Sequence, residues 1–302
     1  MNAKTDAIAV FDSGVGGISV LRQLRKLMSG ETFLYLGDSA NAPYGTRPTE
    51  EIRRLSLNVA QTLVDRGIKA LVVACNTATA AAIDTLRQTY PNLIVVGIEP
   101  ALKPAADRFP GGTIGVLATP VTLNEEKFQH LAAHYAQKCT VIKLPAPGLS
   151  ELVEHGKGES SEAENLLRPL LSPWVGKLDA LVLGCTHYPF AAATIRRILG
   201  DDILLLDGGE GTARETKRRL EQAGLLNDSQ GSITIENSLD DPDLLELSHK
   251  LLEGEDYGEK YFGHWHCRRH RQRQNHPDEK HCGPVWRHGV RPQPRQLLQA
   301  PG

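Results

Sequence analysis

Short runs of apolar residues recur at intervals along the first two thirds of the chain. Within each run the apolar positions are continuous and do not alternate with polar ones, which is typical of a strand buried on both faces. The runs cover residues 7–11, 32–36, 70–74, 93–97, 113–118, 141–144, 180–183 and 203–207. The pattern therefore predicts a set of interior strands in parallel sheets.

Between most of these runs the apolar positions change to a helical spacing of three or four residues. One such stripe comprises Ile18, Leu21, Leu24 and Leu27, and another comprises Ile52, Leu55, Val59 and Leu63. Strands that alternate with amphipathic helices indicate βαβ units. The expected fold class is α/β, with mainly parallel sheets flanked by helices.

In such sheets a ligand binds beyond the carboxyl ends of the strands, so the segments after each apolar run are the candidates for a site. Four of them are rich in small and polar residues. They read DSGVGG at 12–17, GDS with PYG between 37 and 45, CNTA at 75–78 and GCTHYP at 184–189. The sequence predicts a functional site where these segments meet.

Two of these regions are similar to each other. Residues 70–83 (ALVVACNTATAAAI) and 180–195 (ALVLGCTHYPFAAATI) both run from a strand through a small residue, a Cys and a hydroxyl-rich turn into an alanine-rich helix. The similarity indicates two related α/β halves that face each other. Each half then presents one Cys at a strand-to-helix junction.

Cys75 and Cys185 are the first candidates for chemistry. Each precedes a predicted helix, whose N–H groups and dipole favour a thiolate and lower the thiol pKa from its ordinary value of about 8.5. For either Cys alone, a small buried apolar side chain is the alternative interpretation. Cys139 is followed by an apolar run and is interpreted as structural.

Two opposed thiols suit the inversion of a carbon centre, which needs a base on one face and an acid on the other. Disulfide exchange and zinc binding are competing uses of two cysteines. The first usually has C-x-x-C, which these residues lack, and the second needs more Cys or His at short spacing. Neither a metal nor a cofactor is expected in this part of the chain.

The DSGVGG segment is not a dinucleotide fingerprint, because Ser19 occupies the position of the third glycine. A glycine-rich turn at a helix start can still hold a carboxylate with its N–H groups. Asp12 would then supply a negative charge for an ammonium group, or it caps the helix. His187, two residues after Cys185, and Glu154, in an expected polar loop, are candidates to assist a thiol.

Composition divides the chain into two parts. The whole chain has 302 residues and a net charge of −2, but residues 264–302 hold eight basic and two acidic residues and six of the eleven His. Residues 1–263 therefore carry a net charge of −8. The tail has few branched aliphatic residues, so it is expected to be disordered.

The tail also carries residues that favour a different kind of function. Potential zinc ligands are His264, His266, Cys267, His270, His276, His281 and Cys282, and Arg268, Arg269, Arg271 and Arg273 form a basic cluster suited to phosphates. The segment lacks a finger spacing, so a solvated extension without function is the favoured interpretation, and no nucleic-acid partner is expected.

Three further features of the sequence indicate where in the cell the protein is expected. No apolar run is long enough to cross a membrane, and the first twenty residues do not resemble a secretory signal. Five cysteines without close pairing argue against a secreted disulfide scaffold. The expected location is the cytoplasm.

Together the motifs resemble the glutamate racemase family over roughly residues 7–225. They are FDSGVGG, PYG, ACNTAT, the pair Glu99–Pro100, LATPVT and GCTHYP, in that order along the chain. The resemblance implies two similar α/β domains with the active site in the cleft between them. Domain one would comprise residues 1–97 and 209–255, domain two residues 98–208, and residues 256–302 a tail unlike the family.

The same resemblance implies cofactor-independent interconversion of L- and D-glutamate, which supplies D-glutamate for peptidoglycan. Aspartate racemase, or another relative with paired thiols, is the nearest alternative. A homodimer and activation by a cell-wall precursor are further properties of some family members.

The site residues follow from the resemblance, position by position. Cys75 and Cys185 are the acid–base thiols, and Asp12, Glu154 and His187 tune them. The substrate-binding positions are Asp12 and Ser13 for the ammonium group, Asn76, Thr77 and Thr186 for the α-carboxylate, Tyr44 and the Gly45 N–H for the side-chain carboxylate, and Thr119, Thr122 and His187 around the pocket.

Overall fold

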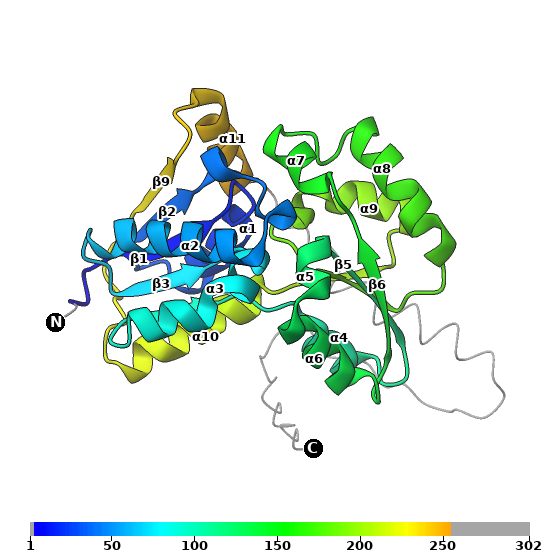
Figure 1. The fold of residues 1–302 in the computed structure, drawn as a ribbon, viewed down its shortest axis with the longest axis horizontal. Coiled ribbons are helices and arrows are strands. Elements are labelled where there is room, and N and C mark those ends of the chain that lie inside the picture. Colours follow the sequence, from blue (N-terminus) through cyan, green and yellow to red (C-terminus); the bar gives the residue numbers. More distant parts are fainter. Residues whose placement is uncertain (1–2, 255–302) are drawn as a thin grey trace, which may run out of the picture. The chain divides into compact units, whose positions relative to one another are not determined.

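The computed structural model describes residues 3–254, which form two parallel sheets flanked by helices (Figure 1). The first sheet has the strand order β4-β3-β1-β2-β9. Its strands are β1 (Ile8–Asp12), β2 (Phe33–Gly37), β3 (Ala70–Val73), β4 (Ile94–Gly97) and β9 (Ile233–Asn237), and each pairs in parallel with its neighbours. The chain therefore returns to this sheet after building the second one.

The second sheet has the strand order β6-β5-β7-β8. Its strands are β5 (Thr113–Ala118), β6 (Thr140–Pro145), β7 (Ala180–Leu183) and β8 (Leu204–Asp207), again paired in parallel. β3 and β7, which precede the two cysteines, both have a neighbour on either side. Both strands are fully buried, as their continuous apolar runs predict.

Helices cover both faces of the first sheet. Ala9 and Phe11 of β1 pack in one cluster with apolar residues of α2 (Thr49–Val64) and α3 (Asn76–Thr89). Ile8 and Val10, on the opposite face, pack with α1 (Ile18–Leu27), α10 (Gly209–Gln222) and α11 (Pro242–Glu253). Successive side chains of β1 thus point to opposite faces of the sheet and pack into two different hydrophobic cores.

The second sheet is covered in the same way. The core on one of its faces includes residues of α8 (Ser161–Leu171) and α9 (Ala192–Leu199), and α4 (Leu102–Arg108) contacts β5 and β7. The shorter elements are α5 (Pro120–Asn124), α6 (Glu126–Tyr135), α7 (Leu149–Glu154) and the 3-10 turns η1 (Ser39–Asn41), η2 (Tyr44–Thr46), η3 (Ser172–Trp174) and η4 (Tyr188–Ala191). Among the described residues, none of the helices is both long and apolar enough to span a membrane.

The expected α/β class is confirmed, and every predicted strand is present within one residue at each end. The two helical stripes lie in α1 and α2, although Leu27 is partly exposed at the end of α1. β9 is a strand that the apolar pattern missed. The division into domains at residues 97–98 and 208–209 stays a prediction, and the predictions for the tail after residue 254 lie outside the described residues.

Candidate active site

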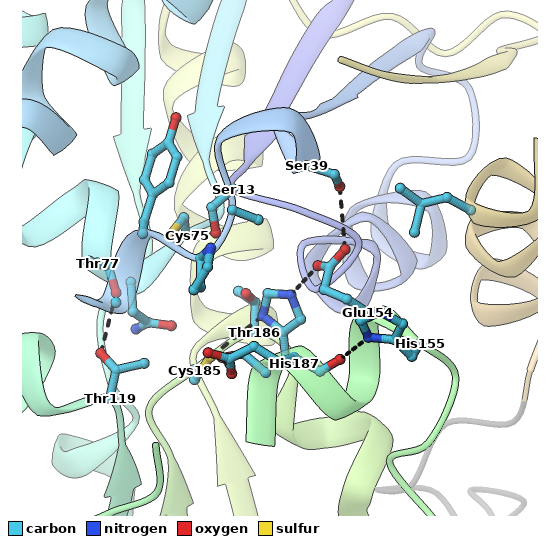
Figure 2. Close-up of a pocket in the computed structure, with 18 of the residues that line it drawn as sticks. Ser13, Ser39, Cys75, Thr77, Thr119, Glu154, His155, Cys185, Thr186 and His187 are labelled. Carbon is cyan, nitrogen blue, oxygen red and sulfur yellow. Dashed lines mark hydrogen bonds and ion pairs between the residues drawn. The ribbon is translucent and has the colours of Figure 1, made fainter. Parts of the chain in front are cut away.

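A cavity of about 300 Å³ lies at the carboxyl ends of strands from both sheets. Of the thirteen predicted site residues, eleven line it: Ser13, Tyr44, Gly45, Cys75, Asn76, Thr77, Thr119, Glu154, Cys185, Thr186 and His187. Figure 2 shows several of these side chains and the hydrogen bonds that join them. Segments more than a hundred residues apart in sequence therefore form one polar pocket.

Cys75 is the N-cap residue of α3, two residues beyond the end of β3. Its Sγ accepts a hydrogen bond from the Ala78 N–H at 3.4 Å and lies 3.5 Å from Ser13 Oγ. The side chain is 5% exposed, and burial together with the negative charge of Asp12 raises the pKa of Cys75 to about 12. The Ala78 N–H at the helix start does act to lower this pKa, but it does not offset the loss of solvation, so the expected net lowering is wrong.

Cys185 occupies the equivalent place, two residues beyond β7, but its surroundings differ. The chain continues into the 3-10 turn η4, and α9 begins only at Ala192. The turn and the alanine-rich helix expected after this Cys are present, but the helix begins too far along the chain for its first N–H groups to act on the thiol, so that part of the prediction is wrong. Instead, Cys185 Sγ lies 3.6 Å from Nδ1 of His187, so an imidazole takes the place of the helix N-terminus.

His187 links Cys185 to Glu154. Its Nε2 is 2.5 Å from Glu154 Oε1, and both side chains are largely buried. Burial lowers the pKa of His187, but the hydrogen bonds and negative charges of Cys185 and Glu154 outweigh it and raise that pKa well above its usual range. The contacts therefore favour a cationic imidazole that pairs with the ionised carboxylate of Glu154.

Glu154 is the last residue of α7, and not part of a loop as the sequence suggested. Burial raises the pKa of its carboxyl, but the hydrogen bond and charge of His187, with the Val15 N–H and Ser39, hold it below its usual range. The Val15 N–H donates to Oε1 at 2.7 Å, and Ser39 Oγ donates to Oε2 at 3.3 Å. The carboxylate is thus ionised and fixed.

The glycine-rich turn binds a carboxylate of the protein itself, because the Val15 N–H donates to Glu154. The expectation that this turn holds the carboxylate of a ligand stays a prediction. A Cβ on Gly14 would lie 1.8 Å from Glu154 Oε1, and one on Gly16 would lie 2.4 Å from His187 Nδ1. Glycine is therefore required at both positions because the imidazole and the carboxylate pass directly over the backbone.

Asp12 lies behind the cavity wall and does not line it. Its Oδ1 accepts from the Gly14 N–H at 3.0 Å and its Oδ2 from Thr186 Oγ1 at 2.9 Å, while burial raises the pKa of the carboxyl. It does not cap α1, whose N-cap residue is Gly17 without a side-chain bond. Asp12 therefore acts on the pocket through Thr186 and through its charge.

Asn76 is the most available polar group in the pocket. Its Oδ1 and Nδ2 are buried and have no hydrogen-bond partner, so the side chain can both donate to and accept from a ligand. Beside it the hydroxyls of Thr77, Thr119 and Thr122 lie 3.0–3.4 Å from one another. Thr122 completes this cluster but lines a neighbouring cavity, so the expectation that it lines the main pocket is wrong.

Tyr44 is less available than the sequence suggested. Its hydroxyl donates to Asp38 Oδ2 at 2.6 Å, and burial and this carboxylate raise the Tyr44 pKa. The phenol proton is therefore engaged, and the Gly45 backbone remains as the predicted partner on this side of the pocket. Gly45 is tightly packed, since a Cβ there would lie 3.0 Å from Thr119 Cγ2.

Sequence reasoning missed part of the lining. It comprises Ser39, Ala42, Pro43, Ser150, Glu151, His155, Leu239, Asp241 and Leu244. Ser39 and Pro43 lie in the GDS and PYG segments, so their positions carried a signal. The others carried none: Ser150 and Glu151 lie in α7, Leu244 lies in α11, and Ala42, His155, Leu239 and Asp241 lie in connections between elements. Within the described part of the chain, the lining contains no Lys or Arg, and no group of three or more His, Cys, Asp or Glu is arranged to hold a metal ion.

Comparisons with known proteins agree on one family. A family model described as Asp/Glu/Hydantoin racemase matches residues 16–216. The glutamate racemase of Clostridium perfringens is 47% identical over 253 residues, which cover 83% of this chain and 97% of that protein. The glutamate racemase of Clostridium acetobutylicum is 48% identical over 256 residues, which cover 84% of this chain and all of that one.

Solved structures give the same result. Thermus thermophilus glutamate racemase in complex with β-chloro-D-alanine has a TM-score of 0.70 at 36% identity and covers 84% of this chain and 95% of its own. Escherichia coli glutamate racemase in complex with L-glutamate and the activator UDP-MurNAc-Ala has a TM-score of 0.70 at 29% identity, with coverage of 82% and 92%.

Proposed function

Because this chain belongs to the Asp/Glu/hydantoin racemase family, we propose that it interconverts L-glutamate and D-glutamate by a two-thiol mechanism without a cofactor. The observation that carries the proposal is the pair Cys75 and Cys185. Both lie two residues beyond an interior strand, one in each sheet, and both line one cavity. The close similarity to glutamate racemases supports glutamate as the substrate.

The two thiols have different neighbours, His187 beside Cys185 and the Ala78 N–H with Ser13 beside Cys75. For L-glutamate, the Cys185 thiolate beside His187 takes the α-proton, so that the C–H bond breaks and an S–H bond forms. The electron pair left on the α-carbon then takes a proton from the Cys75 thiol on the opposite face. For D-glutamate the two residues exchange roles. A Cys75 pKa of about 12 suits this thiol to the part of acid in the first direction.

Neutral donors hold the substrate in the proposed complex. The α-carboxylate binds Asn76, Thr77 and the backbone N–H of Thr186, whose hydroxyl already donates to Asp12. The unpartnered amide of Asn76 supports this assignment. The ammonium group binds Ser13, with Asp12 supplying charge from behind the wall. These contacts stabilise the carbanion because preorganised donors in a water-poor site act on charge as it develops.

The wider role follows from the proposed product. D-Glutamate would be supplied to peptidoglycan synthesis, and the reaction would take place in the cytoplasm. The E. coli relative was solved with the activator UDP-MurNAc-Ala, and a similar precursor and a homodimer are the partners that we propose here. Activity with and without UDP-MurNAc-Ala, and sedimentation of the purified chain, test these two points.

Single Cys→Ser variants test the mechanism. Both Cys75→Ser and Cys185→Ser should abolish racemisation, because a hydroxyl is a far weaker base than a thiol near neutral pH. Cys139→Ser is the matched control and should retain activity, since Cys139 is also buried and free but does not line the cavity.

An analogue with a leaving group on the β-carbon separates the two thiols further. 3-Chloroglutamate needs only proton abstraction before it loses chloride, so each variant should still process one enantiomer. The family resemblance assigns D to Cys75 and L to Cys185. If both variants still process the same enantiomer of 3-chloroglutamate, the two thiols do not lie on opposite faces of the substrate. A clear preference of the wild-type enzyme for aspartate would overturn the assignment of glutamate as the substrate.

A further inference from the structure

A continuous series of hydrogen bonds leads from Cys185 to the end of β9, well away from the reacting atoms. It passes through His187 and Glu154, and then from Glu154 Oε2 to Ser39 Oγ at 3.3 Å. Ser39 Oγ in turn accepts from Asn237 Nδ2 at 2.8 Å. Figure 2 shows the segment from Ser39 to His187.

The direction of this series is fixed at its outer end. Asn237 Oδ1 accepts from the Leu239 backbone N–H at 2.9 Å, and a backbone N–H can only donate. The amide of Asn237 must therefore present its NH₂ group to Ser39. Since Ser39 Oγ accepts that bond, its single proton is left to donate to Glu154.

The inner end is fixed in the same way. Glu154 Oε1 accepts from the Val15 N–H, and its ionised carboxylate has no proton of its own to give. His187 Nε2 must then carry a hydrogen and donate it to Glu154. In this orientation of the ring, Nδ1 faces Cys185 Sγ. The donor of each bond is thus fixed, and the donors converge on the Glu154 carboxylate, from Ser39 on one side and from His187 on the other.

The backbone holds the outer pair in register. Gly37, the last residue of β2, pairs with Asn237, and the Ser238 N–H donates to the Gly37 carbonyl at 2.8 Å. A Cβ on Gly37 would lie 3.0 Å from Asn237 Nδ2 and 2.5 Å from the Gly14 carbonyl oxygen. The parallel pairing of β2 with β9 therefore places the amide against Ser39.

We propose that Ser39 and Asn237 are positioning residues that orient the Glu154 carboxylate, and through His187 serve the Cys185 thiol but not the Cys75 thiol. The inference rests on the proposed two-thiol racemisation. The asymmetry follows from the contacts, because the hydrogen bonds of the Cys75 sulfur in the described chain are to Ser13 and the Ala78 N–H. Neither belongs to the series.

Two substitutions interrupt the series at different points. Ser39→Ala removes the hydroxyl, and Ser39→Thr should restore it. Asn237→Asp keeps the oxygen that receives the Leu239 N–H but loses the donor, and its carboxylate competes with Glu154 for the Ser39 proton. Asn227→Asp is the matched control, because Asn227 Oδ1 also accepts the N–H two residues on, from Ser229, and Asn227 does not line the cavity.

Racemisation alone cannot reveal an effect on one thiol. The two enantiomers of glutamate have equal free energy, so kcat/KM must fall equally in both directions whichever thiol is impaired. Elimination from each enantiomer of 3-chloroglutamate separates them, because it needs only one proton abstraction. The enantiomer that Cys75→Ser still processes identifies the substrate of Cys185.

For that enantiomer, Ser39→Ala and Asn237→Asp should lower kcat/KM by about three- to tenfold, which corresponds to the net contribution of one ordinary hydrogen bond. For the other enantiomer the change should stay within about twofold, and Ser39→Thr and Asn227→Asp should match the wild-type enzyme. Equal losses for both enantiomers, or no loss in folded variants as judged by circular dichroism, would overturn the inference. A wild-type enzyme that does not racemise glutamate would instead overturn the proposed function.

Discussion

Cys75 has to lose a proton before it can remove one from D-glutamate, and its surroundings oppose that loss. Its sulfur is buried, its two hydrogen-bond contacts are 3.4 and 3.5 Å long, and the Asp12 charge adds to the penalty, so its pKa rises to about 12. At pH 8 this leaves roughly one thiolate in ten thousand molecules of the free enzyme. Because the charge of Asp12 raises this pKa, Asp12→Asn should lower it.

Alkylation by iodoacetamide, quantified on the Cys75 peptide by mass spectrometry, measures the thiolate directly. The rate should rise about tenfold for each pH unit from 7 to 10 without a plateau, and it should be higher in Asp12→Asn at every pH. Limited access of the reagent changes the absolute rate but not this slope. A plateau below pH 9, as for an ordinary cysteine, would refute the reasoning.

Three further substitutions test separate contacts. Glu154→Gln replaces a charged acceptor of His187 with a neutral one, so kcat/KM measured by polarimetry should fall roughly tenfold, equally in both directions; an unchanged rate would contradict the charge assignment. Gly16→Ala places a Cβ 2.4 Å from Nδ1 of the buried His187, so racemisation should be largely lost, and full activity would be inconsistent with the close approach. Lys69→Met leaves Glu31, its fully buried partner, without a counter-charge and should reduce the free energy of urea unfolding by about 3–5 kcal/mol; an unchanged midpoint would argue against a buried ion pair.

The strands and the placement of the thiols could be predicted from the sequence, because interior parallel strands need apolar residues on both faces. β9 is the strand that this criterion does not detect. It lies at the edge of its sheet, and in ITIEN only Ile235 is buried, so the strand has no continuous apolar run. An edge strand with one solvated face does not carry the signature of an interior one.

The details of the site depend on contacts that a local pattern does not contain. Glu154 ends a helix of six residues, too short for a helical period to appear, and Ser39 meets Asn237 across 198 positions of sequence. The pKa of the Cys75 thiol is raised mainly by burial and then by the charge of Asp12, which is distant in sequence. The N–H group at the helix start lowers this pKa by less. Local sequence therefore predicted which residues gather at the site but not their protonation.

The most direct test of the two-thiol reaction is the fate of the α-hydrogen in deuterated water, with L-glutamate as substrate and no added cofactor. If the Cys185 thiolate removes the proton and the Cys75 thiol delivers another from the opposite face, D-glutamate formed in the first turnovers will carry deuterium at the α-carbon, while the remaining L-glutamate stays unlabelled. Mass spectrometry of the separated enantiomers measures both. D-Glutamate that retains the original hydrogen would contradict the account.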